Sequence, residues 1–140
     1  MSPDDLVRIE RALGHPLSPA VHAFFLNYPP ELRSTTRDLG PTSEGEPYLE
    51  CPADYELSEC ADAIIALNAP GAVSGYDLTS RRLVVGQGGC GEAFWVDLDD
   101  PMGSAYRFDA GMDPKYSDHL AASLEQFAQG LIESYRAFKG

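Results

Sequence analysis

The chain has 140 residues, with 22 Asp and Glu against 10 Lys and Arg, which gives a formal charge of −12. Its length is typical of a single domain, and its 44% hydrophobic and 23% charged residues are typical of a globular protein. We therefore expect one domain over residues 1–140. The charge argues against nucleic acids and anionic membrane surfaces as partners, because both are bound through Lys and Arg. A basic protein, by contrast, would be attracted by it.

The apolar stretches and the cysteines bear on where the protein resides. No apolar stretch approaches the roughly 18 residues that a membrane-spanning helix needs. The first residues are polar and acidic, unlike the basic and then apolar start of a signal peptide. Cys51, Cys60 and Cys90 show no Cys-x-x-Cys spacing, which indicates neither a disulfide framework nor a zinc site. We expect a cytoplasmic protein with reduced cysteines and no metal or other cofactor.

Two short helices are predicted at the start of the chain. Ser2 and Pro3 are suited to begin the first, and Gly14 to end it. Ser18 and Pro19 repeat the start signal, and a pair of prolines ends the second helix. Helical spacing places apolar side chains on one face of each helix, which predicts a hairpin that needs a covering layer. These side chains are Leu6, Ile9, Leu13, Val21, Phe24 and Phe25.

An acidic window overlaps a predicted loop over residues 33–47, which is rich in Ser, Thr, Gly, Pro and Glu. Residues 38–62 contain eight Asp and Glu and no Lys or Arg. Within this window we expect a short strand at Tyr48–Cys51, and from Ser58 to Asn68 a helix. The helix would bury Cys60 or Ala61, together with Ile64, Ile65 and Leu67.

The second half of the chain predicts strands and a final helix. Three segments with β-branched or aromatic residues are separated by short turn sequences, which favours an antiparallel meander: Arg82–Gly86, Ala93–Leu98 and Ser104–Asp109. A capping box of Ser123 and Gln126 begins the final helix. Its buried stripe is expected to be Leu124, Phe127, Leu131, Tyr135 and Phe138. The fold class is therefore α+β, with an N-terminal helical hairpin, a central antiparallel sheet and a C-terminal helix packed against it.

Residues 86–91 match the nucleotide-binding pattern G-x-G-x-x-G letter for letter. That pattern binds a pyrophosphate only where a strand precedes it and a helix follows. Here the following segment, Ala93–Leu98, alternates like a second strand. The pattern is therefore interpreted as a glycine-rich hairpin loop.

Asp97, Asp99 and Asp100 form the most concentrated acidic group outside that window. Hard cations favour carboxylates, but these three lack the fixed spacing of a calcium loop, so a solvated turn is the preferred interpretation. The three histidines share no metal-ligand spacing, and no nucleophile motif is present. We expect no enzyme. A small hydrolase that uses these carboxylates with a metal stays open as the alternative.

Two features are compatible with protein binding. Strand alternation places Trp95, the only tryptophan, on the face opposite Phe94 and Val96. It either faces outward and anchors a partner, or packs beneath a helix. The acidic window at 38–62 is likewise either a solvated face or a docking surface for a basic protein.

Three stretches, in this order, resemble the SUKH superfamily, which includes fungal cell-wall-synthesis regulators and bacterial immunity proteins. Ile9–Ala20 is similar to its opening I-E-x-x-L-G-x-x-L-P motif. Leu83–Leu98 resembles its glycine-turn hairpin, which leads into an aromatic strand. Leu120–Phe127 resembles the A-x-S-F-x-x-F start of its closing helix. The chain differs from these motifs at Ser18, Glu92 and Leu124.

The resemblance implies a non-enzymatic binding protein. Bacterial members typically bind and neutralise a cognate toxin, often a nuclease, and nucleases tend to be basic because they hold phosphates. The alternative is a regulatory scaffold domain that binds housekeeping proteins, as the fungal members do. No oligomeric state is implied. The surface expected to bind the partner comprises Glu44, Glu46, Glu50, Asp54 and Glu56, with Glu92 and Trp95 as additions.

Overall fold

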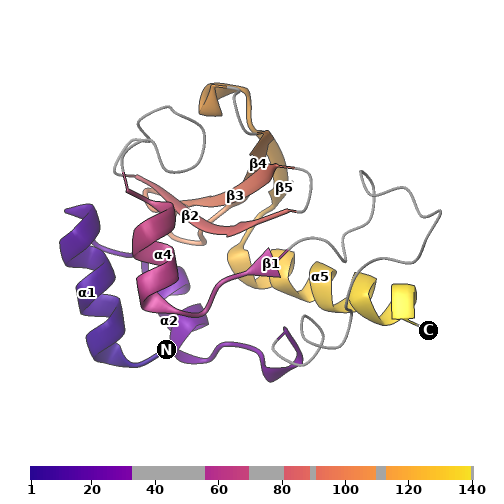
Figure 1. Ribbon diagram of the computed structural model, residues 1–140, viewed down its shortest axis with the longest axis horizontal. Helices are drawn as coiled ribbons and strands as arrows, with labels where there is room; N and C mark the ends of the chain where they lie inside the picture. The colour runs from indigo at the N-terminus through magenta and orange to yellow at the C-terminus, as the bar shows by residue number, and fades with distance from the viewer. Residues whose placement is uncertain (33–55, 70–80, 89–90, 110–112, 140) are drawn as a thin grey trace.

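The computed structural model describes residues 1–32, 56–69, 81–88, 91–109 and 113–139 (Figure 1). Within these residues two helices precede the strands, a third helix separates the first strand from the other four, and a last helix follows, so the predicted α+β class is confirmed. The elements are α1 (Pro3–Leu13), α2 (Pro19–Leu26), β1 (Glu56–Leu57), α4 (Ala61–Leu67), β2 (Arg82–Gln87), β3 (Glu92–Asp97), β4 (Ala105–Asp109), the 3-10 turn η3 (Pro114–Tyr116), β5 (Asp118–Ala121) and α5 (Leu124–Lys139).

The five strands form one antiparallel sheet in the order β1-β2-β3-β4-β5. The predicted meander is therefore confirmed, and β1 and β5 extend it at its two edges. Neither of these was predicted. β1 has only two residues, and β5 begins with Asp118 and His119 and carries no apolar alternation, so neither has the pattern of a strand. The strand expected at Tyr48–Cys51 lies outside the described residues.

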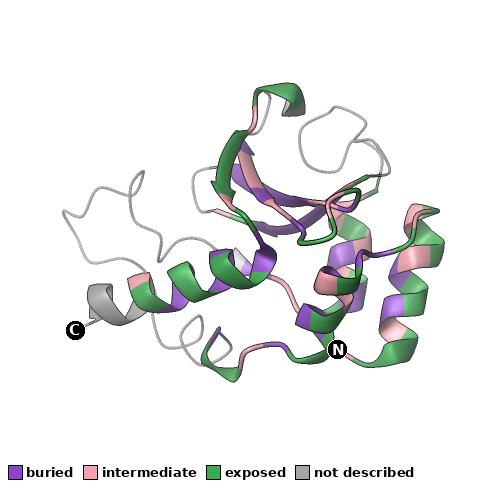
Figure 2. Ribbon diagram, turned by 180° about the vertical axis from the view of Figure 1, so that it is seen from behind, coloured by how far each residue is buried: buried purple, intermediate pink, exposed green. Residues whose placement is uncertain are grey.

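The helices lie together against one face of the sheet (Figure 1). The core between these layers joins strand residues such as Val85 and Phe94 to helix residues such as Ile9 and Phe25. α5 contributes Leu124, Phe127 and Leu131, and the rings of Phe94 and Phe127 have centroids 5.2 Å apart. Buried and exposed residues alternate along α5, as expected of a helix that covers a core (Figure 2). The predicted packing of the C-terminal helix is confirmed.

The helix ends follow their sequence signals with two differences. Ser2 and Asp5 form a reciprocal capping box, and Gly14 ends α1 in the left-handed conformation. Ser18 precedes α2, but its side chain makes no capping hydrogen bond, and only its carbonyl accepts from the His22 amide. α4 begins at Ala61, three residues later than the predicted helix. Of the two residues expected to be buried at its start, Ala61 is buried and Cys60 is exposed.

The other face of the sheet carries a smaller apolar cluster. Val84, Ala93, Trp95 and Phe108 are buried there, with Leu67 and Tyr106 packed against them. β3 is consequently buried on both faces, and only Asp97 at its end is partly exposed. Among the described residues, no helix combines the length and the apolar character that crossing a membrane requires.

Candidate interaction surfaces

The predicted binding residues fall into three groups in the structure. Glu44, Glu46, Glu50 and Asp54 lie outside the described residues. Glu56 begins β1, where its backbone pairs with Gln87 of β2. Glu92 and Trp95, the two additions, are both buried. The structure therefore describes no surface that joins these seven residues.

Glu92 is 6% exposed at the start of β3. Strand alternation places its side chain on the same face as Phe94 and Val96, which is the face covered by helices. Its cross-strand partner is Asp109 of β4. The prediction that Glu92 belongs to an exposed binding surface is therefore wrong, because its side chain is buried.

Trp95 is 3% exposed, so it is packed and does not face outward, but it lies in the cluster on the face of the sheet away from the main helical layer. Its indole stacks on Tyr106 with ring centroids 4.3 Å apart and donates a 2.8 Å hydrogen bond to the Ser117 hydroxyl. The Arg82 guanidinium lies 5.0 Å from the ring centroid, and His119 meets Tyr106 edge-on. The tryptophan is thus held inside a row of side chains that crosses four strands, and it is not an outward-facing anchor.

The carboxylates of the β3–β4 turn hold the turn together. Asp97 accepts a hydrogen bond from the Asp99 amide, and Asp100 accepts bonds from the amide of Met102 and the hydroxyl of Ser104. The Ser104 hydroxyl bond is the main reason why the pKa of Asp100 is lowered. Asp99 lies 3.4 Å from His15 Nε2. Among the described residues, no three His, Cys, Asp or Glu side chains converge as a metal site would require.

The glycine-rich segment is the hairpin loop that the sequence predicts. It leads from β2 into β3, which is a strand and not a helix. Gly88 donates a 2.8 Å hydrogen bond to the Glu92 carbonyl, and Gly91 adopts a φ of 90°. The context that a pyrophosphate site needs, a helix directly after the glycines, is therefore not met.

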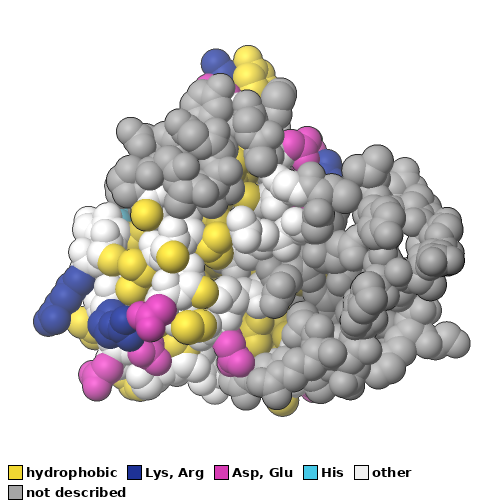
Figure 3. All heavy atoms as spheres, viewed as in Figure 1, with side chains coloured by type: hydrophobic (Ala, Val, Ile, Leu, Met, Phe, Trp, Pro, Cys, Tyr) yellow, Lys and Arg dark blue, Asp and Glu magenta, His cyan; other side chains and the backbone are white. Residues whose placement is uncertain are grey.

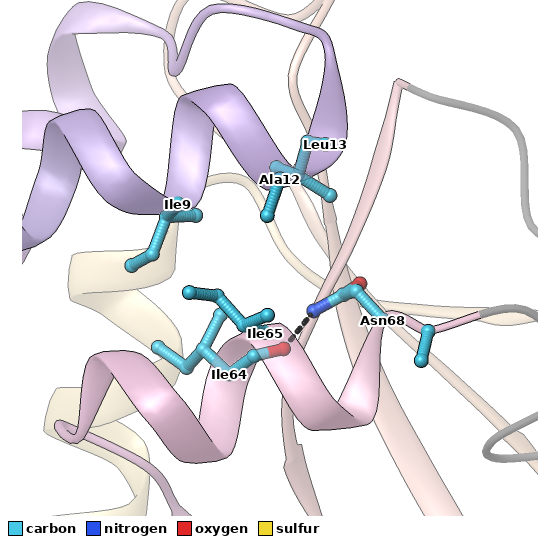
Figure 4. A pocket seen from close by; sticks show the side chains of 7 residues that line it. Ile9, Ala12, Leu13, Ile64, Ile65 and Asn68 are labelled. Atoms are coloured by element: carbon cyan, nitrogen blue, oxygen red, sulfur yellow. Dashed lines mark hydrogen bonds between the residues drawn. The ribbon is translucent and has the colours of Figure 1, made fainter.

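A first pocket of about 230 Å³ opens between α1 and α4. Figure 3 shows apolar side chains gathered over these two helices, with charged side chains of both signs at the edge of the patch. An ion pair between Arg8, in the middle of α1, and Asp62, in the first turn of α4, links the two helices. The lining is almost wholly apolar and is seen close up in Figure 4: Ile9, Ala12, Leu13, Ile64, Ile65, Asn68 and Ala69.

The one polar side chain that lines this first pocket, Asn68, is already hydrogen-bonded within the protein. The Asn68 amide donates to the carbonyls of Ile64 and Val84 and accepts from the Val84 amide. The first pocket therefore offers an incoming group only apolar contact.

A second pocket of about 280 Å³ lies where α2, the β3–β4 turn and the start of α5 meet. The turn fits closely against α2 because Gly103 has a φ of 70°, and an added Cβ would lie 2.8 Å from Val21 Cγ2. Met102 belongs to this turn, lines the pocket and is 59% exposed. The pocket combines apolar and polar residues: Ala20, Ala23, Phe24, Asn27, Pro29, Met102, Ser123 and Glu125.

No sequence motif marks this second pocket, because its walls are brought together from three distant segments. One signal was nevertheless present. The segments 12–32, 83–106 and 116–135 supply those walls, and none of them contains a Lys or an Arg.

The chain matches no protein-family model, and comparisons with curated proteins and with solved structures give no match.

Proposed function

We propose that the chain is a non-enzymatic protein-binding domain, a SUKH-type immunity protein that binds and neutralises a basic toxin. Its binding surface is acidic and includes the carboxylates of the 38–62 window. The protein acts by covering the toxin's functional surface, so it needs no cofactor. It resides in the cytoplasm, where the toxin would otherwise act.

The distribution of charge is the observation that carries this proposal. The formal charge is −12, and the 10 cationic residues are separated by long segments that contain only acidic charges. In the described structure the cations lie on α1, at the start of β2, on β4, on η3 and in the last turns of α5. α2, α4, β3 and the β3–β4 turn contain none. A field of one sign over much of a surface accelerates association with an oppositely charged protein and disfavours other partners.

Two further observations support the proposal. The three stretches that resemble the SUKH superfamily occur in the order of its motifs. The carboxylates of the alternative hydrolase function, Asp97, Asp99 and Asp100, are each engaged in a turn contact or with His15. These contacts give them a structural role that requires no substrate.

The product of the adjacent gene, expressed with and without this chain, tests the proposal directly. We expect the chain to restore growth of cells that produce the toxin and to bind the purified toxin with an association rate that falls as salt rises. If the neighbouring product is not neutralised, and several unrelated housekeeping proteins bind instead, the immunity function is contradicted and the scaffold function is favoured.

Charge reversal tests where the toxin binds. Replacement of Glu44, Glu46 and Glu50 by Lys should slow association about tenfold or more and flatten its salt dependence. The control makes the same change in net charge at three other exposed carboxylates, Asp4, Asp109 and Glu133. An association rate that the first variant leaves unchanged, or that both variants lower equally, would refute the assignment to this window.

A further inference from the structure

We infer that the second pocket, between α2, the β3–β4 turn and the start of α5, receives an arginine side chain of the basic protein partner. This inference rests on the proposed function, because it names the contact by which a basic partner is anchored. It places that contact on described residues, at a distance in sequence from the 38–62 window.

The size of the pocket fits one side chain better than a free ligand. Its volume of about 280 Å³ lies just below the range of pockets that hold small molecules, about 300–1,000 Å³. Interfaces are commonly anchored by one large side chain in such a pocket, and arginine is among the residues most enriched there.

The apolar part of the lining suits the stem of an arginine. Phe24 and Met102 face the pocket from α2 and from the turn, and Ala20 and Ala23 leave room between them. Phe24 offers an aromatic ring, on which a planar guanidinium can stack. The exposed Met102 side chain is unbranched and can follow the shape of an incoming stem.

The polar part of the lining consists of groups that accept hydrogen bonds. Glu125 is an exposed carboxylate at the start of α5. The Asn27 amide nitrogen donates to the Ala23 carbonyl, which leaves its oxygen directed elsewhere, with no hydrogen bond among the described residues. The Ser123 hydroxyl oxygen accepts from the Gln126 amide and has one further lone pair with which to accept. A guanidinium carries five donors and no acceptor, so its hydrogen-bonding chemistry matches this lining.

The charge around the pocket favours a cation. Its three walls come from segments without Lys or Arg, and these segments carry Asp99 and Asp100 beside Met102. The first pocket differs, because one of its walls is α1, which carries Arg8 and Arg11. Glu125 disfavours an anion in the second pocket by charge repulsion.

The probe for this contact is N-acetyl-arginine N-methylamide, titrated into the ¹⁵N-labelled full chain and followed by amide chemical shifts. We expect saturable shifts at the second pocket, around residues 20–27, 102 and 123–125. The capped norleucine analogue, which keeps the stem and loses the charge, should bind more weakly, and the capped glutamate should not bind. Saturable shifts that lie elsewhere, or no saturable shifts, would overturn the inference.

Two matched pairs of variants make the test specific. Ala23→Leu fills the second pocket from an exposed helical position and should abolish the shifts, whereas Ala12→Leu does the same to the first pocket and should leave them intact. Glu125→Gln should weaken binding about twofold to fivefold, while Glu133→Gln on the same helix should not change it.

Failure of this inference can be told apart from failure of the proposed function. If Ala23→Leu leaves arginine binding unchanged, the pocket is not the arginine site, whatever the toxin assay shows. A chain that neutralises its toxin equally well with Ala23→Leu retains the proposed function and loses this contact. A chain that binds the arginine probe but neutralises no toxin loses the proposed function alone.

Discussion

The side chain of Asn68 pairs with the backbone of Val84 as a neighbouring strand would. Its amide nitrogen donates to the Val84 carbonyl at 2.9 Å, and its oxygen accepts from the Val84 amide at 2.7 Å. β1 pairs with β2 only at Gly86 and Gln87, so these two groups of Val84 receive no partner from the sheet itself. The residue that ends α4 thereby satisfies the strand and fixes the helix to the edge of β2.

Replacement of Asn68 by Ala should lower the free energy of unfolding by about 2–4 kcal/mol, because it leaves two backbone groups of the fully buried Val84 without partners. The control is Asn27→Ala. Asn27 also ends a helix and donates to a carbonyl four residues earlier, but it is exposed and bonds no strand, so its loss should cost about 1 kcal/mol. Urea unfolding followed by far-ultraviolet circular dichroism measures both. Equal losses would show that the contact to Val84 contributes nothing beyond the helix end.

Replacement of Gly103 by Ala should destabilise the protein more than replacement of Gly14. Both glycines have a φ of 70°, which costs any other residue about 1 kcal/mol. At Gly14 an added Cβ meets nothing within 4 Å, whereas at Gly103 it would press on the buried Val21. We expect losses of about 1 and about 3 kcal/mol respectively, measured by the same unfolding experiment. A loss at Gly103 no larger than that at Gly14 would contradict the close fit of the turn against α2.

Replacement of Gly130 by Ala should stabilise the protein. Gly130 is exposed within α5, and an added Cβ would meet nothing within 4 Å. Glycine lowers helix stability relative to alanine by about 0.5–1 kcal/mol, since its backbone loses more freedom on folding. The midpoint of thermal unfolding should therefore rise by a few degrees. An unchanged or lower midpoint would mean that this turn of α5 departs from helical geometry in solution.

Ser104→Ala should raise the pKa of Asp100 toward its ordinary value of 3.8, because the Ser104 hydroxyl bond is the main cause of the lowered value. A carboxyl group with a lowered pKa in the folded state stabilises the fold above its unfolded pKa, and loses that contribution as the pH falls through the folded value. The contribution of Asp100 is thus complete at neutral pH and disappears only below about pH 4. Carboxyl ¹³C shifts measured against pH report the change. A pKa that the substitution leaves unmoved would show that the backbone amides alone hold it.

Local signals in the sequence predicted most of the fold. Ser2 and Gly14 bound the first helix because capping acts over three or four residues, and alternation in Ala93–Leu98 predicted the central strand to within one residue at each end. β1 and β5 were missed because each gains its stability from a neighbouring strand and not from its own residues. The bulge of β2 near Val85, which shifts the register against β3, likewise depends on tertiary contacts.

The candidate sites were predicted less well than the fold. Alternation showed correctly that Trp95 lies opposite Phe94, but periodicity does not state whether the second face of a sheet is covered. Asn27 and Glu125, two polar residues of the second pocket, are 98 positions apart in the sequence, so no motif could join them. Only the shared lack of Lys and Arg in its walls was visible beforehand.

The burial of Trp95 has a practical consequence for every experiment proposed above. As the only tryptophan, stacked on Tyr106 and bonded to Ser117, it makes the intrinsic fluorescence of the chain a measure of packing on the face of the sheet away from the helices. Unfolding exposes the indole and should shift its emission to the red. Arginine bound between α2 and α5, in the helical layer, should leave that emission where it is. The chain thus contains its own optical control for whether a variant that loses its partner has also lost its fold.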